Sequence, residues 1–570
     1  MQDSKSRPAT GEKFAADGWT AAFVTALVAF ACRLPALGAW WNQDDWGLLG
    51  RAAGIAPQPA IPARWLTQTA YWRILWPVAG LDPAPYAFTR LGLHALAVAG
   101  LVRLAARLGL GRLQQWVAGL VLAASPLAFG PLYWAAGIQD LAAVTLMVWA
   151  LERWLAPGRL ARPAAAALAV GALAAKETVI GLPVLLAILL VRDSTARRDR
   201  TAWLLIAGMT LAAAAAAVLA LRSFSTGPDD PYALAGPLAG LGRLLVYGWW
   251  LILPGPSYPT VLGLGMGLGG ALVWLAWGGW GARRWRRGDR TPAFTLAGAL
   301  LVLAPLLPLA RHVAPDLAFP VEPFGCLALA ALVPGRWRPR AVVVGALVAA
   351  AAAWGLFGML ARLGLRDATG LPADPLVRRT AVSAEACRQL ARWPVPAAGL
   401  VFVQPPLTGA TAAMAAELGE NWVTGSVVYH GLGGTLGPRL VLGPEVPVVW
   451  ANGLRETPEG AFVLLDAGGV IKPWGLTDQA LLYQTLTDVG LGLYDRARAH
   501  LLRASLVSGQ TLSVFFDPQL LPIRLERVLA NEEAFYRHLA AGRRPGSGSR
   551  VDDGLQTNFR RLLDACAGRQ

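Results

Sequence analysis

Long apolar runs recur along the first 362 residues and alternate with short polar or basic stretches. Runs of about 17 or more apolar residues can cross a hydrocarbon layer of about 30 Å as helices. A shorter apolar stretch, residues 241–253, predicts a re-entrant or interfacial segment. The pattern predicts about eleven spanning helices, at residues 19–37, 86–106, 114–132, 135–155, 163–175, 178–191, 202–221, 259–281, 292–310, 317–333 and 341–360.

Basic residues sit mainly in the short loops at one side of these helices. Residues 1–362 carry 31 Lys and Arg against 16 Asp and Glu, whereas residues 363–570 carry 20 against 19. Basic loops mark cytoplasmic ends, and the strongest are Arg192–Arg200 and Arg283–Arg287. The pattern therefore predicts a cytoplasmic tail at residues 1–18, a membrane domain at 19–362 and an extracytoplasmic, periplasmic region at 363–570.

Composition also indicates a membrane protein. The chain is 55% hydrophobic and only 15% charged, and its mean hydropathy is +0.45. A soluble domain would carry about 25% charged residues. The net charge of +16 is explained by loop orientation, so it does not indicate nucleic-acid binding. We expect a multi-pass protein of the cytoplasmic (inner) membrane.

The region after residue 372 has the pattern of a small α/β or α+β domain. Short apolar runs at residues 399–404, 446–450 and 460–466 predict buried strands, and helical spacing follows at 480–508, 522–539 and 555–567. Of the four cysteines, Cys32 and Cys326 lie in apolar segments and are expected to be buried thiols. Cys387 and Cys566 could pair if this region is extracytoplasmic.

Candidate chemistry begins at Asp44 and Asp45, which follow the first apolar run and lie between Trp41 and Trp46. This acidic pair belongs to a first external loop, residues 38–85, whose arginines and tryptophans are typical of helices lying in the membrane interface. Acidic residues at that depth are more often functional than incidental. The alternative is an interfacial loop with solvated aspartates.

Three further polar positions are predicted at the same side of the membrane. They are Gln139–Asp140 near the outer end of one helix, Lys176–Glu177 between two helices, and Arg311–His312. Acids and bases gathered at one depth indicate a single polar cavity. Lys176–Glu177 could instead be solvated at a helix end, and Arg311–His312 could anchor a helix at the headgroups.

These stretches, in this order, resemble the GT-C superfamily of membrane glycosyltransferases, particularly protein O-mannosyltransferases and their TMTC-type relatives. The resemblance covers roughly residues 19–333 and does not extend to the C-terminal region. The similar stretches are Asp44–Asp45, Arg90–His94, Pro131–Asp140, Ala174–Pro183 and Arg311–Pro323, with Ala175 in place of the usual serine and His312 in place of tyrosine.

The resemblance implies inverting transfer of a sugar from a polyprenyl-phosphate donor to a glycan, lipid or protein acceptor on the extracytoplasmic face. Asp44 would be the catalytic base and Asp45 its partner or a ligand of a divalent metal, and Asp140 would orient the acceptor or a metal. Lys176, Arg311 and His312 would contact the donor phosphate, with Glu177, Gln139 and His94 in support. His94 could equally be a hydrogen-bonding residue in helix packing.

Two other classes stay open. A transporter or flippase of lipid-linked glycans would also need a basic cavity within the membrane, but it would tend to show internal repeats, and none is apparent. A non-catalytic membrane protein of envelope glycan assembly could display the C-terminal region, although that would leave the acids on one side unexplained.

Overall fold

The computed structural model describes residues 10–58, 64–192, 196–223, 234, 236–253, 263–309, 313–334, 340–366, 372–392, 399–403, 427–451, 462–466 and 471–473. Contacts divide the chain into two compact units, Met1–Thr380 and Ala381–Gln570. The sequence places the domain boundary after residue 362, whereas this division falls within α16 (Pro375–Leu390).

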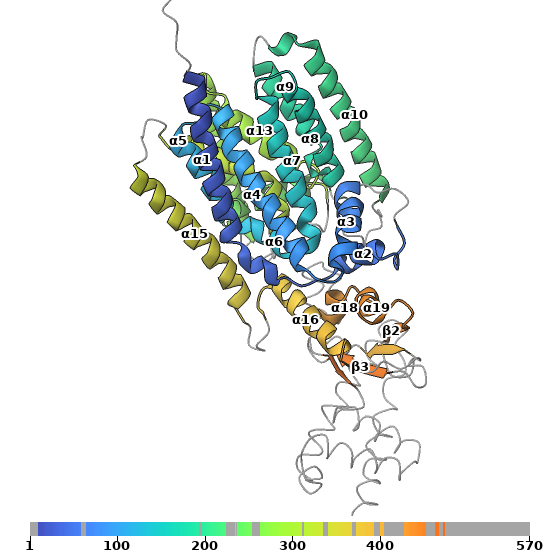
Figure 1. Cartoon of the computed structure of the whole chain (residues 1–570). Helices are drawn as coiled ribbons and strands as arrows, with labels where there is room; N and C mark the ends of the chain where they lie inside the picture. Colours follow the sequence, from blue (N-terminus) through green and yellow to red (C-terminus); the bar gives the residue numbers. More distant parts are fainter. Residues whose placement is uncertain are drawn as a thin grey trace, which may run out of the picture. The chain divides into compact units, whose positions relative to one another are not determined.

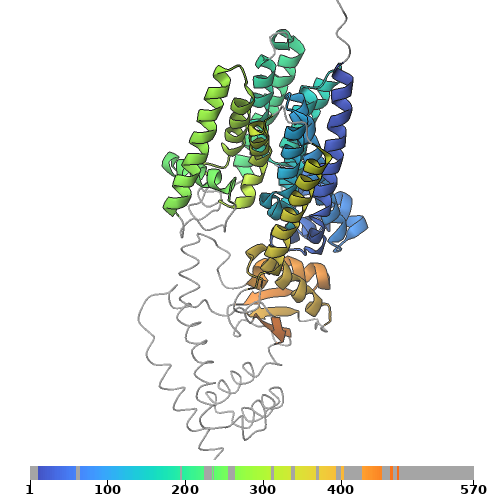
Figure 2. The same cartoon turned by 90° about the vertical axis from the view of Figure 1, so that its left-hand side faces the viewer.

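The first unit is a bundle of helices, in which α1, α4 and α7 run side by side (Figures 1 and 2). Its α-helices are α1 (Thr10–Ala31), α2 (Asp44–Ala52), α3 (Tyr71–Ala79), α4 (Ala84–Arg107), α5 (Arg112–Ala124), α6 (Phe129–Tyr133), α7 (Ile138–Trp154), α8 (Ala161–Ala175), α9 (Leu182–Arg192), α10 (Arg200–Ser223), α11 (Pro237–Trp250), α12 (Gly263–Arg286), α13 (Thr291–Leu303), α14 (Glu322–Leu332) and α15 (Ala341–Gly364). Shorter turns are η1 (Leu34–Gly38), η2 (Leu66–Ala70), η3 (Pro126–Ala128), η4 (Ala135–Gly137), η5 (Glu177–Val179), η6 (Ala196–Arg198) and η7 (Pro315–Val321).

Helix is present in each of the eleven predicted segments, and residues 241–253 lie mostly in α11. By length and composition, five helical stretches of the described chain can cross a membrane: Ala84–Arg107, Ala135–Trp154, Arg200–Arg222, Pro315–Leu332 and Ala341–Gly364. A sixth is added if Arg112–Ala124 and Pro126–Tyr133, bent by 41°, form one span. The chain is therefore a helical, multi-pass membrane protein, and eleven crossings stay a prediction.

Topology can be tested at the C-terminus. Because an odd number of crossings follows a cytoplasmic start, a reporter fused after Gln570 is expected to be active if it works only outside the cytoplasm. The measurement is reporter activity in cells, with the same reporter fused within Arg283–Arg287 as the cytoplasmic control. Activity of a cytoplasm-only reporter at Gln570 would show that the number of crossings is even.

The bend after α5 has a local cause. Pro126 cannot continue the helical hydrogen bonds of α5, and the Ser125 hydroxyl accepts a hydrogen bond from the Leu127 amide at 3.1 Å. Arg33, 1% exposed, satisfies the carbonyl groups left at this break. Its guanidinium donates to the carbonyl oxygens of Ser125 at 2.5 Å and Ala123 at 3.4 Å, and to Gly355 of α15 at 3.2 Å.

Small residues bring α8 against α7. Ala165, Ala169 and Ala172 recur at helical spacing on one face of α8, and all three are fully buried. Side chains without bulk let two helix backbones approach closely in a membrane. This packing fixes the end of α8 next to the start of α7, where the polar residues of the next subsection lie.

In the second unit, the described strands form a sheet in the order β2-β1-β3-β4. The strands are β1 (Leu400–Val403), β2 (Val448–Ala451), β3 (Phe462–Asp466) and β4 (Ile471–Pro473), and α18 (Val427–Gly431) and α19 (Leu436–Leu442) precede β2. The central strand β1 runs parallel to β2 and β3, with Leu400 opposite Val448 and Phe462, whereas β4 is antiparallel to β3. Phe402 and Trp450 stack with ring centroids 4.2 Å apart.

The three strands expected from the sequence are confirmed. The helices expected at 480–508, 522–539 and 555–567 lie outside the described residues, so the class of the whole C-terminal domain stays a prediction. Cys32 and Cys326 are buried thiols, as expected. Cys387 is buried, but Cys566 lies outside the described residues, so their pairing also stays a prediction.

Candidate active site

The acidic pair forms the first turn of α2, where the helix dipole favours negative charge. The residue before it, Gln43, has φ 48° and ψ −114°, and it is the one non-glycine residue of the described chain with a positive φ. Such a conformation costs about 1–3 kcal/mol, and strained residues of this kind cluster at functional sites. The chain therefore accepts backbone strain where it presents Asp44 and Asp45.

Asp45 is fully buried and ties α2 to the bundle. Its Oδ2 accepts a hydrogen bond from the Asn42 amide at 3.0 Å, and its Oδ1 accepts one from the Ala136 amide in η4 at 2.7 Å. Burial raises the pKa of Asp45 to about 7, although these hydrogen bonds and the charge of Arg90 oppose the shift. Asp45 thus fixes the loop and is turned away from solvent.

Asp44 has the opposite situation. Part of its side chain is in contact with solvent, although the neighbouring protein removes much of the water around the carboxylate. Desolvation by that protein raises its pKa, while the charges of Arg379, Arg64 and Arg51 lower it. A carboxyl group that is accessible and has a raised pKa holds a proton more strongly than an ordinary aspartate, which suits a general base.

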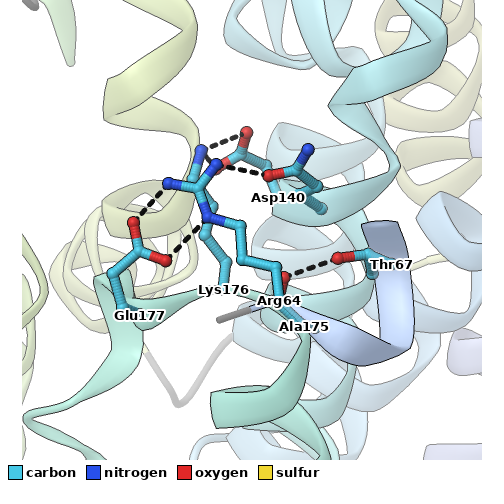
Figure 3. Close-up of polar contacts among 7 residues, drawn as sticks. Arg64, Thr67, Asp140, Ala175, Lys176 and Glu177 are labelled. Atoms are coloured by element: carbon cyan, nitrogen blue, oxygen red, sulfur yellow. Dashed lines mark hydrogen bonds and ion pairs between the residues drawn. The ribbon is translucent and has the colours of Figure 1, made fainter. Parts of the chain in front are cut away.

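A second group of polar residues joins three distant segments (Figure 3). The Lys176 ammonium donates to both carboxylate oxygens of Asp140, at 2.7 and 2.8 Å. The Arg64 guanidinium donates from Nη1 to Gln139 Oε1 at 2.6 Å and from Nε to Glu177 Oε2 at 2.7 Å, and Nη2 pairs with Glu177 Oε1. The first external loop, the start of α7 and the junction of α8 and α9 meet here.

These ion pairs are largely withdrawn from water. The side chains of Arg64 and Glu177 are 13% and 16% exposed, and those of Lys176 and Asp140 are 8% and 10% exposed. Burial alone would raise the pKa of Glu177, but the charge and hydrogen bonds of Arg64 lower it to about 2. Thr67 adds a neutral link, because its hydroxyl donates to the Ala175 carbonyl at 2.7 Å.

The structure thus brings together Gln139, Asp140, Lys176 and Glu177, which the sequence singled out. His94 is buried in α4 beside Phe319, with ring centroids 6.2 Å apart. Arg311 and His312 lie outside the described residues, so their role as phosphate ligands stays a prediction.

Two residues of this region were not expected from the sequence. The sequence pattern predicts only an interfacial role for Arg64, yet this residue connects Gln139 to Glu177. Asp316, in η7, lies within electrostatic reach of Asp140 and Lys176. The signal that could have identified Asp316 is its position within residues 311–323, one of the stretches that resemble GT-C enzymes.

Close packing before α7 gives a stability prediction. A Cβ atom on Gly137 would lie 2.5 Å from the Cα and 2.6 Å from the carbonyl oxygen of Pro131. Gly137→Ala is expected to cost about 1–3 kcal/mol through overpacking and to lower activity, because the Ala136 amide and Gln139 would shift. Thermal unfolding measures the loss. Gly92→Ala, at a site in α4 with nothing within 4 Å, is the control and should not destabilise the protein.

The two shifted carboxyl groups predict opposite pH effects on stability. Asp45 binds its proton more tightly in the folded state, so its contribution is present below pH 3.8 and is lost as pH rises to about 7. Glu177 contributes stability above pH 4.5 that is lost as pH falls to about 2. The measurement is the unfolding temperature as a function of pH. Asp45→Asn should reduce its dependence on pH between 3.8 and about 7, and Glu177→Gln should reduce it between 4.5 and about 2. If both variants show the same pH dependence of the unfolding temperature, the raised pKa of Asp45 and the lowered pKa of Glu177 are both contradicted.

No protein-family model matches the chain, and no curated protein matches it. Among solved structures, the chain is similar to the arabinofuranosyltransferase AftD from Mycobacteria, determined by single-particle cryo-EM. The TM-score is 0.39 and the sequence identity 17%, over 71% of this chain and 30% of that chain. This chain thus spans about 30% of the length of the arabinofuranosyltransferase.

Proposed function

We propose that the protein is a membrane glycosyltransferase that moves a sugar from a polyprenyl-phosphate donor to an acceptor on the extracytoplasmic face. The observation that carries the proposal is the buried contact group of Arg64, Gln139, Asp140, Lys176 and Glu177. Gln139, Asp140, Lys176 and Glu177 come from two of the five stretches in which the sequence resembles GT-C enzymes, and Arg64 comes from the first external loop. An accessible carboxyl group, Asp44, lies within electrostatic reach of Arg64.

In the proposed step, an acceptor hydroxyl attacks the anomeric carbon of the sugar. The new bond joins the hydroxyl oxygen to that carbon, and the bond from the carbon to the phosphate oxygen breaks. The electron pair leaves with the polyprenyl phosphate, and Asp44 takes the hydroxyl proton. Asp45 is a positioning residue, because its two hydrogen bonds to backbone amides hold α2 in place.

The leaving phosphate needs a cation or a hydrogen-bond donor. The Lys176 ammonium has three N–H donors, and its contacts with the two oxygens of Asp140 use at most two of them, so a further N–H can reach a ligand. We assign Lys176 to the donor phosphate on this basis, with Arg311 and His312 as further candidates from the sequence. The prenyl chain of the donor would lie against the apolar helices, whose surfaces are as apolar as the lipid tails of the bilayer.

A divalent metal at Asp45 and Asp140 is a separate expectation. Both oxygens of Asp45 accept backbone hydrogen bonds, and both oxygens of Asp140 accept from Lys176. In the described part of the chain, no three His, Cys, Asp or Glu side chains form a group that could hold a metal ion. These described residues therefore do not fit a divalent metal site.

The test uses the purified full chain and a polyprenyl-phosphate donor with a labelled sugar. We expect release of polyprenyl phosphate, and we expect Asp44→Asn to release far less. Movement of intact donor across proteoliposomes without release would indicate a transporter. Neither release nor movement, with several sugars and extracted membrane acceptors, would favour a non-catalytic membrane protein.

A further inference from the structure

A buried carboxylate at the other end of α7 is surrounded by three arginines. Glu152 is fully buried. Its Oε1 lies 3.2 Å from Arg107 Nε and 3.6 Å from Arg103 Nη2, and its Oε2 lies 2.8 Å from Arg153 Nε. Twelve residues separate Glu152 from Asp140 along α7, which corresponds to about 18 Å at the helical rise. This cluster is therefore distinct from the candidate active site.

Two tryptophans complete the cluster. The Arg103 guanidinium lies over the Trp19 ring at 4.4 Å, and the Arg153 guanidinium lies 5.8 Å from the Trp149 ring. The rings of Trp19 and Trp149 stack with centroids 6.4 Å apart. Three helices, α1, α4 and α7, thus hold the arginines in fixed positions, and tryptophan is typical of the membrane–water interface.

Positive charge predominates among the described side chains of this cluster, because three guanidinium groups face the one carboxylate of Glu152. The inner pair is closed to solvent, with side chains of Arg103 and Glu152 6% and 0% exposed. Arg107 and Arg153 are 28% and 36% exposed, so part of each planar group can meet an anion. Arginine is suited to bind phosphate in this way.

An apolar stripe begins at the same cluster. Trp19, Phe23 and Leu27 recur at a spacing of four on α1, and they are 48%, 65% and 52% exposed. Leu96 of α4, 51% exposed, lies beside Trp149, whose indole N–H donates to the Leu96 carbonyl at 3.0 Å. An acyl chain could lie along this stripe, which a free phosphate ion would not use.

We propose that Arg107 and Arg153 bind the phosphate of an anionic phospholipid, with its acyl chain on the stripe of Trp19, Phe23 and Leu27. Glu152 orients the two outer arginines, because its two carboxylate oxygens pair with Arg107 and Arg153. The site lies at the basic ends of α4 and α7, which the loop charges predict to face the cytoplasm, where anionic headgroups bind basic pockets between helices. The proposal is independent of the proposed transfer reaction.

The experiment measures lipid binding to the purified full chain by native mass spectrometry and by thermal unfolding in detergent. The probes are phosphatidylglycerol, phosphatidylcholine and glycerol phosphate. We expect phosphatidylglycerol to bind and to raise the unfolding temperature, with little effect of the other two. Equal effects of phosphatidylcholine would overturn the role of the arginines, and equal effects of glycerol phosphate would overturn the role of the stripe.

Variants of the outer arginines test their role in phosphatidylglycerol binding. Arg107→Gln together with Arg153→Gln should weaken phosphatidylglycerol binding about fivefold for each guanidinium removed. Arg159→Gln removes one positive charge at an exposed position in the loop after α7, so it is the control for each single arginine variant and should change little. If the double variant does not fold, Arg153→Gln alone still leaves Glu152 with two arginines, and its unchanged affinity would overturn the proposal.

Discussion

Asp44→Asn is expected to lower donor turnover by about 10²–10⁴-fold, the usual loss when a positioned base is removed. Asparagine keeps the volume and one oxygen but cannot accept the acceptor's proton. Folding should change little, because Asp44 is exposed and a neutral amide is easier to desolvate than a carboxylate. Donor binding should survive, since the assigned phosphate contact is Lys176.

The measurements are turnover with labelled donor and donor affinity in the absence of acceptor. Asp82→Asn is the matched control, because Asp82 is exposed in the same external loop and its Oδ1 accepts from the Ala84 amide at 3.0 Å, a role that asparagine can keep. Wild-type turnover in both Asp44→Asn and Asp45→Asn would remove this loop from the active site. A loss of donor binding in Asp44→Asn would instead make Asp44 a binding residue.

Arg64→Leu is expected to destabilise the protein by about 3–5 kcal/mol, because it leaves the Glu177 carboxylate buried without its ion-pair partner. Gln139 Oε1 loses its donor in the same variant. Activity should fall with stability, since the loop that presents Asp44 would lose its link to α7. Arg64→Lys keeps the charge but cannot reach Glu177 and Gln139 with one planar group, so an intermediate loss is expected.

Thermal unfolding and turnover check this prediction together. Arg73→Leu removes an exposed arginine from the same loop and should lie within about 0.5 kcal/mol of the wild type. The double variant Arg64→Leu with Glu177→Leu should recover part of the stability, because no unpaired charge is then buried. If Arg64→Leu unfolds at the same temperature as Arg73→Leu, the ion pair with Glu177 is not part of the folded protein.

The helical segments could be predicted because each depends on a local run of apolar residues. The strand at residues 400–403 could be predicted for the same reason. Gln139, Asp140, Lys176 and Glu177 could be selected because each is polar where an apolar residue would be expected. Their pairing could not be predicted, because the sequence pattern indicates how deep a residue lies in the membrane but does not indicate which helices are neighbours.

Arg64 shows what sequence patterns leave out. Its partner Glu177 lies 113 positions away, and an arginine beside Trp65 is ordinary in an interfacial loop. Gln43 gave no signal either, because a positive φ is expected at glycine or asparagine and not at glutamine. The different roles of Asp44 and Asp45 could not be predicted either, because the backbone amides that donate to the Asp45 oxygens reach them only in the folded chain.

Arg33 has a consequence for how the protein is made. The carbonyl groups of Ala123 and Ser125 that accept its hydrogen bonds are synthesised about 90 positions after it, and that of Gly355 follows 322 positions after it. A guanidinium exposed to hydrocarbon is expensive, so α1 cannot rest against lipid on this side while the ribosome completes the chain. Helix insertion and bundle assembly are therefore coupled, and the site of Arg33 closes only when α15, one of the last apolar helices, joins α1 and α5.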